Sequence, residues 1–366
     1  MNSLLDKARH WDIPLLAAGG MLLLAGLVMQ YSTSLSSQNL TIFWRQISFV
    51  VAGIGVYIFF GLYNYYRVVK LHRLLYIAIL SLLFFVLLFA SSVKGSHRWI
   101  NIGYFNLQPA EFCKIVIIIG LARILTVRRG SINTWTNIGL TLLYILLPVV
   151  LVIREPDLGS ALTLVGIWAG VLLVSPIKKY YFILLIIIAI IGSGISWQWI
   201  LKPYQKQRIE VFIDPEVDPQ GKGYNVRQAI IAVGSGGWFG KGLGKGLQSQ
   251  LRFLPERQTD FVFASTAEEV GFLGTGVVVA LYLILLWRLI LIAYLAKDSY
   301  GLYITTGVFF MFLIQITVNI GMNMGIMPVT GIPLPFLTYG GSSLLTSMIA
   351  LGLVQNICSQ ARSLRF

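Results

Sequence analysis

The sequence has little charge for its length. Only 11% of its 366 residues are Asp, Glu, Lys or Arg, whereas 57% are hydrophobic. Soluble domains carry about 25% charged residues, which they need to cover their surface with polar groups. This scarcity excludes a soluble globular protein and predicts that lipid is the main solvent of the chain.

Histidine and cysteine are also scarce, with three and two residues. Cys113 and Cys358 fall inside apolar segments, and two cysteines cannot form a disulfide framework. His97 is the only histidine that we expect on the outer side, which argues against a Ser-His-Asp triad. Because no Cys/His metal spacing occurs, any metal would be bound by oxygen.

What the sequence has in abundance is long apolar runs, separated by polar or Gly/Pro-rich links. A spanning helix needs about 20 apolar residues. Helices are expected because a backbone in lipid must satisfy its own hydrogen bonds, and the alternation of barrel strands is absent. The sequence predicts one all-α membrane domain over residues 1–366, a bundle of about ten transmembrane helices at 13–29, 43–62, 74–90, 107–125, 138–153, 160–174, 182–200, 264–287, 302–327 and 342–357.

The basic residues set the expected orientation. Fourteen Lys and Arg fall on the side that holds both termini, against four in the short links of the other side. The positive-inside rule therefore predicts cytoplasmic termini and a long extracytoplasmic loop at 201–263, between spans seven and eight. The net charge of +14 does not indicate a nucleic-acid partner, because the basic residues stand singly between apolar runs.

Three polar clusters lie at the expected outer ends of spans. In the first, Glu111 and Lys114 share a helix face, either as an ion pair that only fixes packing or as the wall of a substrate cavity. In the second, Asp157 follows Pro156 and can cap the next helix, and Arg154 can hold a phosphate.

The third cluster is the long loop. Its stretch 234–246 is rich in Gly and Lys, which is typical of an anion-binding loop but also of a plain flexible one. An outward site with carboxylates, scattered cations and no histidine base suits either transfer chemistry on a lipid diphosphate or transport of such a lipid.

Together these segments resemble the SEDS family (shape, elongation, division and sporulation), and its elongation branch most. The matching segments include His97-Arg98-Trp99, 108–111, 156–159, 204–208, 214–215, 223–224, 234–237, 254–261, 267–269, 319–322 and 328–343. Ala110, Glu155, Ala229 and Thr338 depart from the residues usual in the family. Glu155 stands where the family usually has glutamine, which adds a negative charge beside Asp157.

The resemblance implies a glycosyltransferase that polymerises lipid II into peptidoglycan on the outer face of the cytoplasmic (inner) membrane and releases undecaprenyl diphosphate. It implies Mg or Mn as a cofactor. It also implies a class B penicillin-binding protein as partner, together with membrane lipids and other proteins of the elongation machinery. Close packing at Gly274, Gly276 and Gly307 is expected to form the partner contact. The alternatives are a lipid II flippase and a scaffold without chemistry.

Asp260 is the expected catalytic residue, as a base or as a metal ligand, because it is the carboxylate of the most characteristic segment that also lies at the mouth of a span. Helix capping is the structural alternative for its role. The residues expected to bind substrate are Arg98, Trp99, Glu111, Lys114, Arg154, Asp157, Arg208, Lys245, Arg257 and Ser342.

Overall fold

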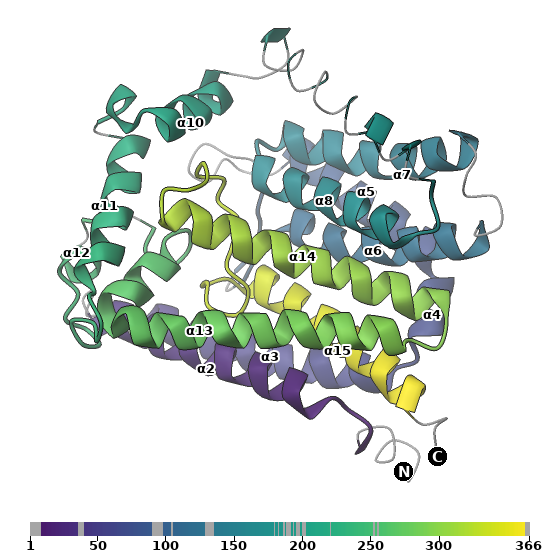
Figure 1. Ribbon diagram of the computed structural model, residues 1–366, viewed down its shortest axis with the longest axis horizontal. Coiled ribbons are helices and arrows are strands. Elements are labelled where there is room, and N and C mark those ends of the chain that lie inside the picture. The colour runs from purple at the N-terminus through teal and green to yellow at the C-terminus, as the bar shows by residue number, and fades with distance from the viewer. Residues whose placement is uncertain are drawn as a thin grey trace.

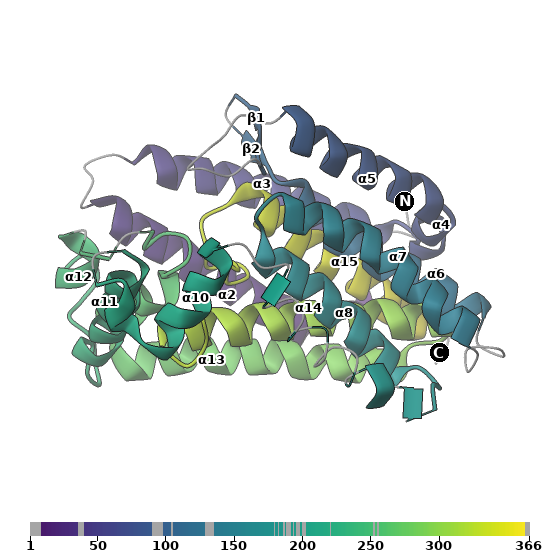
Figure 2. The same cartoon turned by 90° about the horizontal axis from the view of Figure 1, so that it is seen from above.

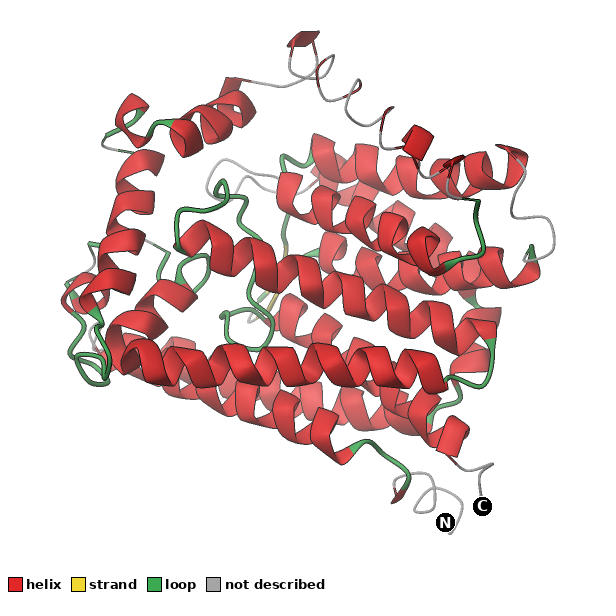
Figure 3. Ribbon diagram, viewed as in Figure 1, coloured by secondary structure: helices red, strands yellow, loops and turns green. Residues whose placement is uncertain are grey.

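The computed structural model describes residues 9–35, 40–89, 98–103, 105–128, 135–178, 203–219, 221–251, 253–254 and 256–362, with scattered positions between 180 and 199. Most of the described residues are helical (Figure 3). The helices that correspond to predicted spans are α2 (Ile13–Leu35), α3 (Thr41–Leu62), α5 (His72–Phe89), α6 (Pro109–Val127), α7 (Trp135–Arg154), α8 (Leu158–Val174), α13 (Val262–Leu295), α14 (Ser299–Asn323) and α15 (Gly341–Arg362).

Seven of these helices are long and apolar enough to cross a membrane: α2, α3, α5, α7, α13, α14 and α15. α6 carries Glu111, Lys114 and Arg123, and α8 has 17 residues, so these two fall outside that group. In the predicted seventh span at 182–200 only scattered positions belong to the described residues. The all-α membrane class is therefore confirmed, and the count of ten spans stays a prediction.

The helices lie side by side along one direction (Figure 1). The start of α2 and the end of α15 lie at one end of this bundle. The other end holds the predicted long loop, which contains α10 (Pro203–Ile213), η3 (Pro215–Val217), α11 (Lys222–Ser235) and α12 (Leu247–Gln250). α4 (Tyr65–Lys70) connects α3 to α5, and strands β1 (Ile100–Ile102) and β2 (Phe105–Leu107) form a hairpin before α6.

The C-terminal helix α15 is the centre of the bundle (Figure 2). In its most apolar stretch 89% of residues are buried, against 17% in α3 and in α5. α3 and α5 therefore present most of their apolar side chains to the surroundings, as expected of helices that contact lipid. α15 also carries polar residues that lipid would not tolerate, including Gln355 and Asn356, which are fully buried.

α13 has an irregular residue in its N-terminal part. Its 34 residues would extend about 51 Å, well beyond a hydrocarbon core of about 30 Å. At Gly271, φ is 70° and ψ is −171°, so the helix is interrupted. The amides of Phe272 and Leu273 donate instead to the carbonyls of Gly237 (2.8 Å) and Trp238 (3.1 Å). The glycine-rich loop thus satisfies the backbone where α13 breaks.

Asp12 joins three helices at the opposite end of the bundle. It precedes α2, is fully buried, and accepts from the amide of Leu15 at 3.0 Å. It also pairs with Arg288 of α13 and with Arg362 of α15, the latter at 2.8 Å. Burial acts to raise the pKa of Asp12, but the hydrogen bond and charge of Arg288 and the charge of Arg362 outweigh it, so the pKa is lowered from 3.8.

Asp12→Asn is therefore expected to lower the free energy of unfolding by about 3 kcal/mol at neutral pH, because it leaves two guanidinium groups without their anion. The contribution of Asp12 is present above pH 3.8 and is lost as the pH falls through its lower folded-state pKa. Thermal unfolding in detergent measures the effect. Glu216→Gln is the control, since the pair of Glu216 with Arg227 is exposed and should contribute under about 1 kcal/mol. Equal losses in the two variants would contradict this account.

Candidate functional site

A polar cavity of about 440 Å³ lies among α3, α10, the link before β1, and two non-helical segments that flank α13 and α14. The first segment, residues 256–260, is called here the Asp260 turn. The second, residues 324–340 between α14 and α15, is called the α14–α15 link. The cavity is lined by Arg45, Phe49, Arg98, Trp99, Asn106, Gln108, Arg208, Glu256, Thr259, Asp260, Thr330, Gly331, Tyr339, Gly340 and Gly341.

Three arginines and two carboxylates set the charge of this cavity. The arginines are Arg45, Arg98 and Arg208, and the acids are Glu256 and Asp260. Arg208 also donates to the carbonyls of Val329 (3.3 Å) and Thr330 (3.1 Å), which attaches α10 to the α14–α15 link. The balance of charge favours a ligand with several negative charges, such as a diphosphate.

The Asp260 turn is held by polar groups of neighbouring segments. The carbonyl of Asp260 accepts from the side-chain amides of Asn319 (3.3 Å) and Asn323 (3.0 Å), both on α14. The Thr259 carbonyl accepts from Thr338 at 3.2 Å. The Asn323 side chain in turn accepts from the amide of Ala264 in the first turn of α13. The backbone that carries Asp260 is therefore fixed although it belongs to no helix.

The side chain of Asp260 faces the α14–α15 link. A β-carbon added at Gly331 would lie 3.7 Å from Asp260 Oδ2, and Gly331 has a φ of +75°. Glycine suits this backbone conformation and leaves the space beside the carboxylate open. The N-cap of α13 is Phe261, so Asp260 stands one position before the cap.

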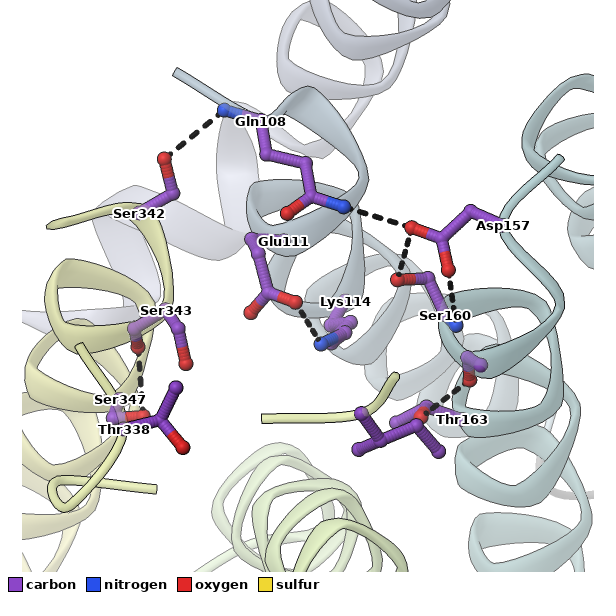
Figure 4. Close-up of polar contacts among 12 residues, drawn as sticks. Gln108, Glu111, Lys114, Asp157, Ser160, Thr163, Thr338, Ser342, Ser343 and Ser347 are labelled. Carbon is purple, nitrogen blue, oxygen red and sulfur yellow. Dashed lines mark hydrogen bonds and ion pairs between the residues drawn. The ribbon is translucent and has the colours of Figure 1, made fainter. Parts of the chain in front are cut away.

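A network around Gln108 forms another part of the wall (Figure 4). The Gln108 side chain donates to Asp157 Oδ2 at 2.7 Å, and its backbone amide donates to Ser342 Oγ at 3.0 Å. Asp157 also accepts from the amide and hydroxyl of Ser160, which confirms that it caps α8. Asp157 and Ser342 are buried, so in this structure they position a lining residue and do not line the cavity themselves.

Glu111 and Lys114 form a deep ion pair. Lys114 Nζ lies 2.6 Å from Glu111 Oε1, and their side chains are only 1% and 2% exposed. Figure 4 shows the pair one to two turns below Gln108 on α6. The expectation that these two residues line the cavity is not met, because the wall closes above them. Glu111 Oε2 has no hydrogen-bond partner among the described residues.

The remaining predicted residues separate into three groups. Arg98, Trp99, Arg208 and Asp260 come together around the cavity. Arg257 is buried and donates to the carbonyl of Thr33 at 3.2 Å, so it anchors the Asp260 turn. Two residues do not belong to the cavity lining, contrary to expectation: Arg154 is exposed at the end of α7, and Lys245 is exposed on the glycine-rich loop.

The glycine-rich loop does not offer its amides to an anion. The amides of Lys241 and Gly242 donate to the carbonyls of Glu268 and Glu269, both at 3.0 Å, and that of Gly244 donates to Ser32. The Glu268 carboxylate accepts from the amides of Gln248 and Ser249. The anion-binding interpretation of this stretch is thus wrong, because the protein's own acceptors occupy the donors.

Sequence reasoning missed several lining residues. Arg45 was counted only among the four basic residues expected on the outer side. A charged residue inside the predicted span 43–62 is itself an indication of a functional site. Glu256 was expected only as a carboxylate that could share a metal with Asp260, and Tyr339 belongs to a matching segment but received no role. Phe49 and Asn106 carry no chemical signal in the sequence, and only the fold brings them to the cavity.

A divalent cation is compatible with the residues present. Mg²⁺ is typically held by one or two carboxylates together with substrate phosphates. Asp260 and Glu256 line the same cavity, and both supply the hard oxygen ligands that such an ion requires. Across the described residues no group of three or more His, Cys, Asp or Glu forms a protein-only metal site. The donor set thus fits an ion shared with a substrate phosphate.

Glu155 is a buried carboxyl without a partner. It follows the last residue of α7, is 1% exposed, and neither carboxyl oxygen has a hydrogen bond within the described part of the chain. Burial raises the pKa of Glu155 to about 8, the negative charge of Asp157 adds to this shift, and Arg98 opposes it. Arg98 NH1 also lies 3.8 Å from Asp157 Oδ2, so the charge of this one guanidinium acts on the carboxyl groups of both Asp157 and Glu155.

Glu155→Gln is expected to stabilise the protein more as the pH rises. A carboxyl whose pKa is raised on folding, here from 4.5 to about 8, stabilises the folded state less as the pH climbs through that window, whereas an amide does not titrate. The gain should reach a few kcal/mol by pH 8. Unfolding midpoints from pH 5 to 9 measure it. A gain that does not change with pH would contradict an ionisable, buried Glu155.

Comparisons with known proteins agree with this architecture. Residues 11–363 match the FtsW, RodA and SpoVE family, described as cell cycle proteins. Stage V sporulation protein E of Bacillus subtilis is 36% identical over 360 residues, which are 96% of this chain and 98% of that protein. Peptidoglycan glycosyltransferase MrdB of Escherichia coli K12 is 35% identical over 363 residues, 98% of each chain.

A solved structure gives the same answer for the fold. One chain of a peptidoglycan synthase complex, described as coordinating polymerization and crosslinking, superposes with a TM-score of 0.83 at 29% identity, over 96% of this chain and 98% of that one. The family match covers nearly the whole sequence, and the relatives match it end to end. The chain therefore belongs to the FtsW, RodA and SpoVE family of cell cycle proteins, the SEDS family that its motifs resemble.

Proposed function

We propose that this protein is a peptidoglycan glycosyltransferase that polymerises lipid II. MrdB, which is 35% identical over 98% of both chains, carries that activity in its name. The observation that carries the proposal is the composition of the 440 Å³ cavity, whose lining contains Asp260 together with three arginines. A carboxylate and several cations are what glycosyl transfer from a diphosphate requires.

The proposed reaction uses these groups in separate roles. The Asp260 carboxylate accepts the proton of the 4-hydroxyl of the acceptor sugar as that oxygen attacks the anomeric carbon of the donor. A new C1–O bond forms, the bond from C1 to the diphosphate oxygen breaks, and undecaprenyl diphosphate leaves with the electron pair. Arg45, Arg98 and Arg208 line the same cavity and are suited to stabilise the charge of the leaving group.

A bound Mg or Mn would neutralise part of the diphosphate charge. Asp260 and Glu256 are the residues that would hold it. Glu256 has a φ of +51° and accepts from the hydroxyl of Thr259, so its side chain is oriented within the same turn as Asp260. Asp260 then acts as a base or as a ligand, and the two roles predict the same loss when the carboxylate is removed.

The cavity is proposed to face outward. The charge bias assigns the end with the α2 start and α15 end to the cytoplasm, and α10, which supplies Arg208, lies at the other end. A class B penicillin-binding protein is the proposed partner, in the elongation branch of the family. Relatives from sporulation and from glycan synthesis are equally similar, so identity alone does not select the branch.

The helix surface proposed for the partner needs one correction. Gly276 of α13 is open, since an added β-carbon would meet nothing within 4 Å. Gly307 of α14 faces inward, where an added β-carbon would lie 2.8 Å from the Ile118 side chain on α6. Gly307 therefore lies in the close packing of α14 against α6 and cannot contact a membrane helix of the partner. Gly276 remains suited to such a contact.

Asp260→Asn is expected to abolish polymerisation while leaving the fold and partner binding intact. The amide has nearly the same shape but is a poor base and a weak metal ligand, so the rate should fall at least 100-fold, the scale that general base catalysis supplies. Full-length protein purified with its partner, in detergent with labelled lipid II, gives the rate. No compartment exists there, so polymer cannot be confused with transport.

Asp214→Asn is the matched control. Asp214 lies in the same outer region and accepts from the amide of Glu216, away from the cavity lining. It should keep wild-type rates. Normal polymer from Asp260→Asn would remove the catalytic assignment, and absence of polymer from the wild-type complex would favour the flippase or scaffold alternatives.

A further inference from the structure

Gln30 is a buried glutamine on α2 that no part of the proposed chemistry uses. It is 0% exposed and lies in the outer part of a membrane helix, where a polar side chain is costly unless it forms hydrogen bonds. Its amide nitrogen donates to the carbonyl of Gln258 at 3.3 Å and to that of Leu337 at 3.2 Å. Both hydrogens of the amide are therefore engaged.

The two acceptors belong to the two non-helical segments that line the cavity. Gln258 is in the Asp260 turn, and Leu337 is in the α14–α15 link. The two segments also contact each other directly, because the amide of Tyr339 donates to the carbonyl of Gln258 at 2.9 Å. Gln30 thus holds the turn that presents Asp260 and the link that presents Gly331 and Tyr339 in one arrangement.

α2 is placed for this contact by a close approach one turn earlier. A β-carbon at Gly26 would lie 2.3 Å from the carbonyl oxygen of Phe336, so only glycine permits this packing. One turn on, the hydroxyl of Thr33 accepts from the Gln258 side chain at 3.4 Å, and its carbonyl accepts from Arg257 at 3.2 Å. Gln30 therefore lies between the close backbone contact at Gly26 and the hydrogen bonds at Thr33.

We propose that Gln30 is a positioning residue, which sets the position of the Asp260 carboxylate relative to the adjoining α14–α15 link in the wall of the cavity. This inference rests on the proposed glycosyl transfer. The bridge reaches backbone atoms of both walls and no lining side chain, so its loss should displace Asp260 relative to the bound acceptor. A shift of about 1 Å in a reacting group can reduce a rate about 100-fold.

Gln30→Met tests this with full-length protein and its partner. Methionine keeps the length of the side chain and removes both donors. The turnover rate at saturating lipid II should fall at least tenfold, with KM within about twofold of wild type, since the arginines are unchanged. Gln355→Met is the control, because Gln355 is also buried in a spanning helix, its side chain hydrogen-bonds the backbone amide and carbonyl of Asp12, and it lies outside the cavity lining. It should lose stability to a similar degree and keep its turnover rate.

Gln30→Glu adds a pH signature that a purely structural role would not give. When protonated, the introduced carboxyl can donate to one of the two carbonyls, and when ionised it repels both. The rate of this variant relative to wild type should be at least fivefold higher at pH 5.5 than at pH 8.5. The relative rate of Gln30→Met should not change with pH. If Gln30→Met does not fold, Gln30→Asn, which keeps the amide but is one methylene shorter, provides the turnover comparison.

The outcomes separate the two proposals. If the wild-type complex forms no polymer, the proposed function fails. If the wild type polymerises and the folded Gln30 variants keep wild-type turnover, or raise KM alone, the positioning role is overturned. The same holds if the rate of Gln30→Glu relative to wild type does not vary with pH.

Discussion

The structure depends on one constraint: backbone that is buried but not helical must find hydrogen-bond partners outside itself. The Asp260 turn and the α14–α15 link both cross the interior of the bundle near the cavity without regular structure. Side chains on the surrounding helices satisfy them, chiefly the amides of Asn319 and Asn323. These polar residues are costly in lipid, and their burial is explained by the irregular backbone that they hold. A catalytic carboxylate can then sit on a rigid turn.

Electrostatics follows the same logic. Charges at the ends of the bundle are paired, as Asp12 is with Arg288 and Arg362. Around the cavity the charges do not balance, because the lining holds three arginines and two carboxylates. The remaining positive charge favours an anionic ligand. Glu155 is the exception behind this wall, because it is a buried ionisable group whose carboxyl oxygens have no hydrogen-bond partner among the described residues.

Much of the fold could be predicted from the sequence, because apolar length and backbone satisfaction leave helices as the only choice in lipid. The cap at Asp157 and the pairing of Glu111 with Lys114 also followed from local spacing. What could not be predicted was which polar residues reach the cavity. Lys245 and Arg154 carry suitable charges but lie outside the cavity lining. Arg45, Asn106 and Gln30 gain their roles only through the tertiary structure, which brings distant parts of the chain together.

The glycine-rich loop shows the same limit. Its composition is that of an anion site, yet its amides at Lys241 and Gly242 donate to the carbonyls of Glu268 and Glu269. Its carbonyls at Gly237 and Trp238 accept from α13 where that helix is interrupted. The local sequence pattern identifies the available amide donors, but the tertiary structure determines which acceptors they bind. A structure of the Asp260→Asn variant with lipid II bound would show most directly whether lipid II reacts in the cavity around Asp260. The acceptor 4-hydroxyl should lie about 2.6–3.2 Å from the side chain at position 260, and the diphosphate should lie against the arginines. A headgroup bound outside this cavity would exclude it as the site of the reaction.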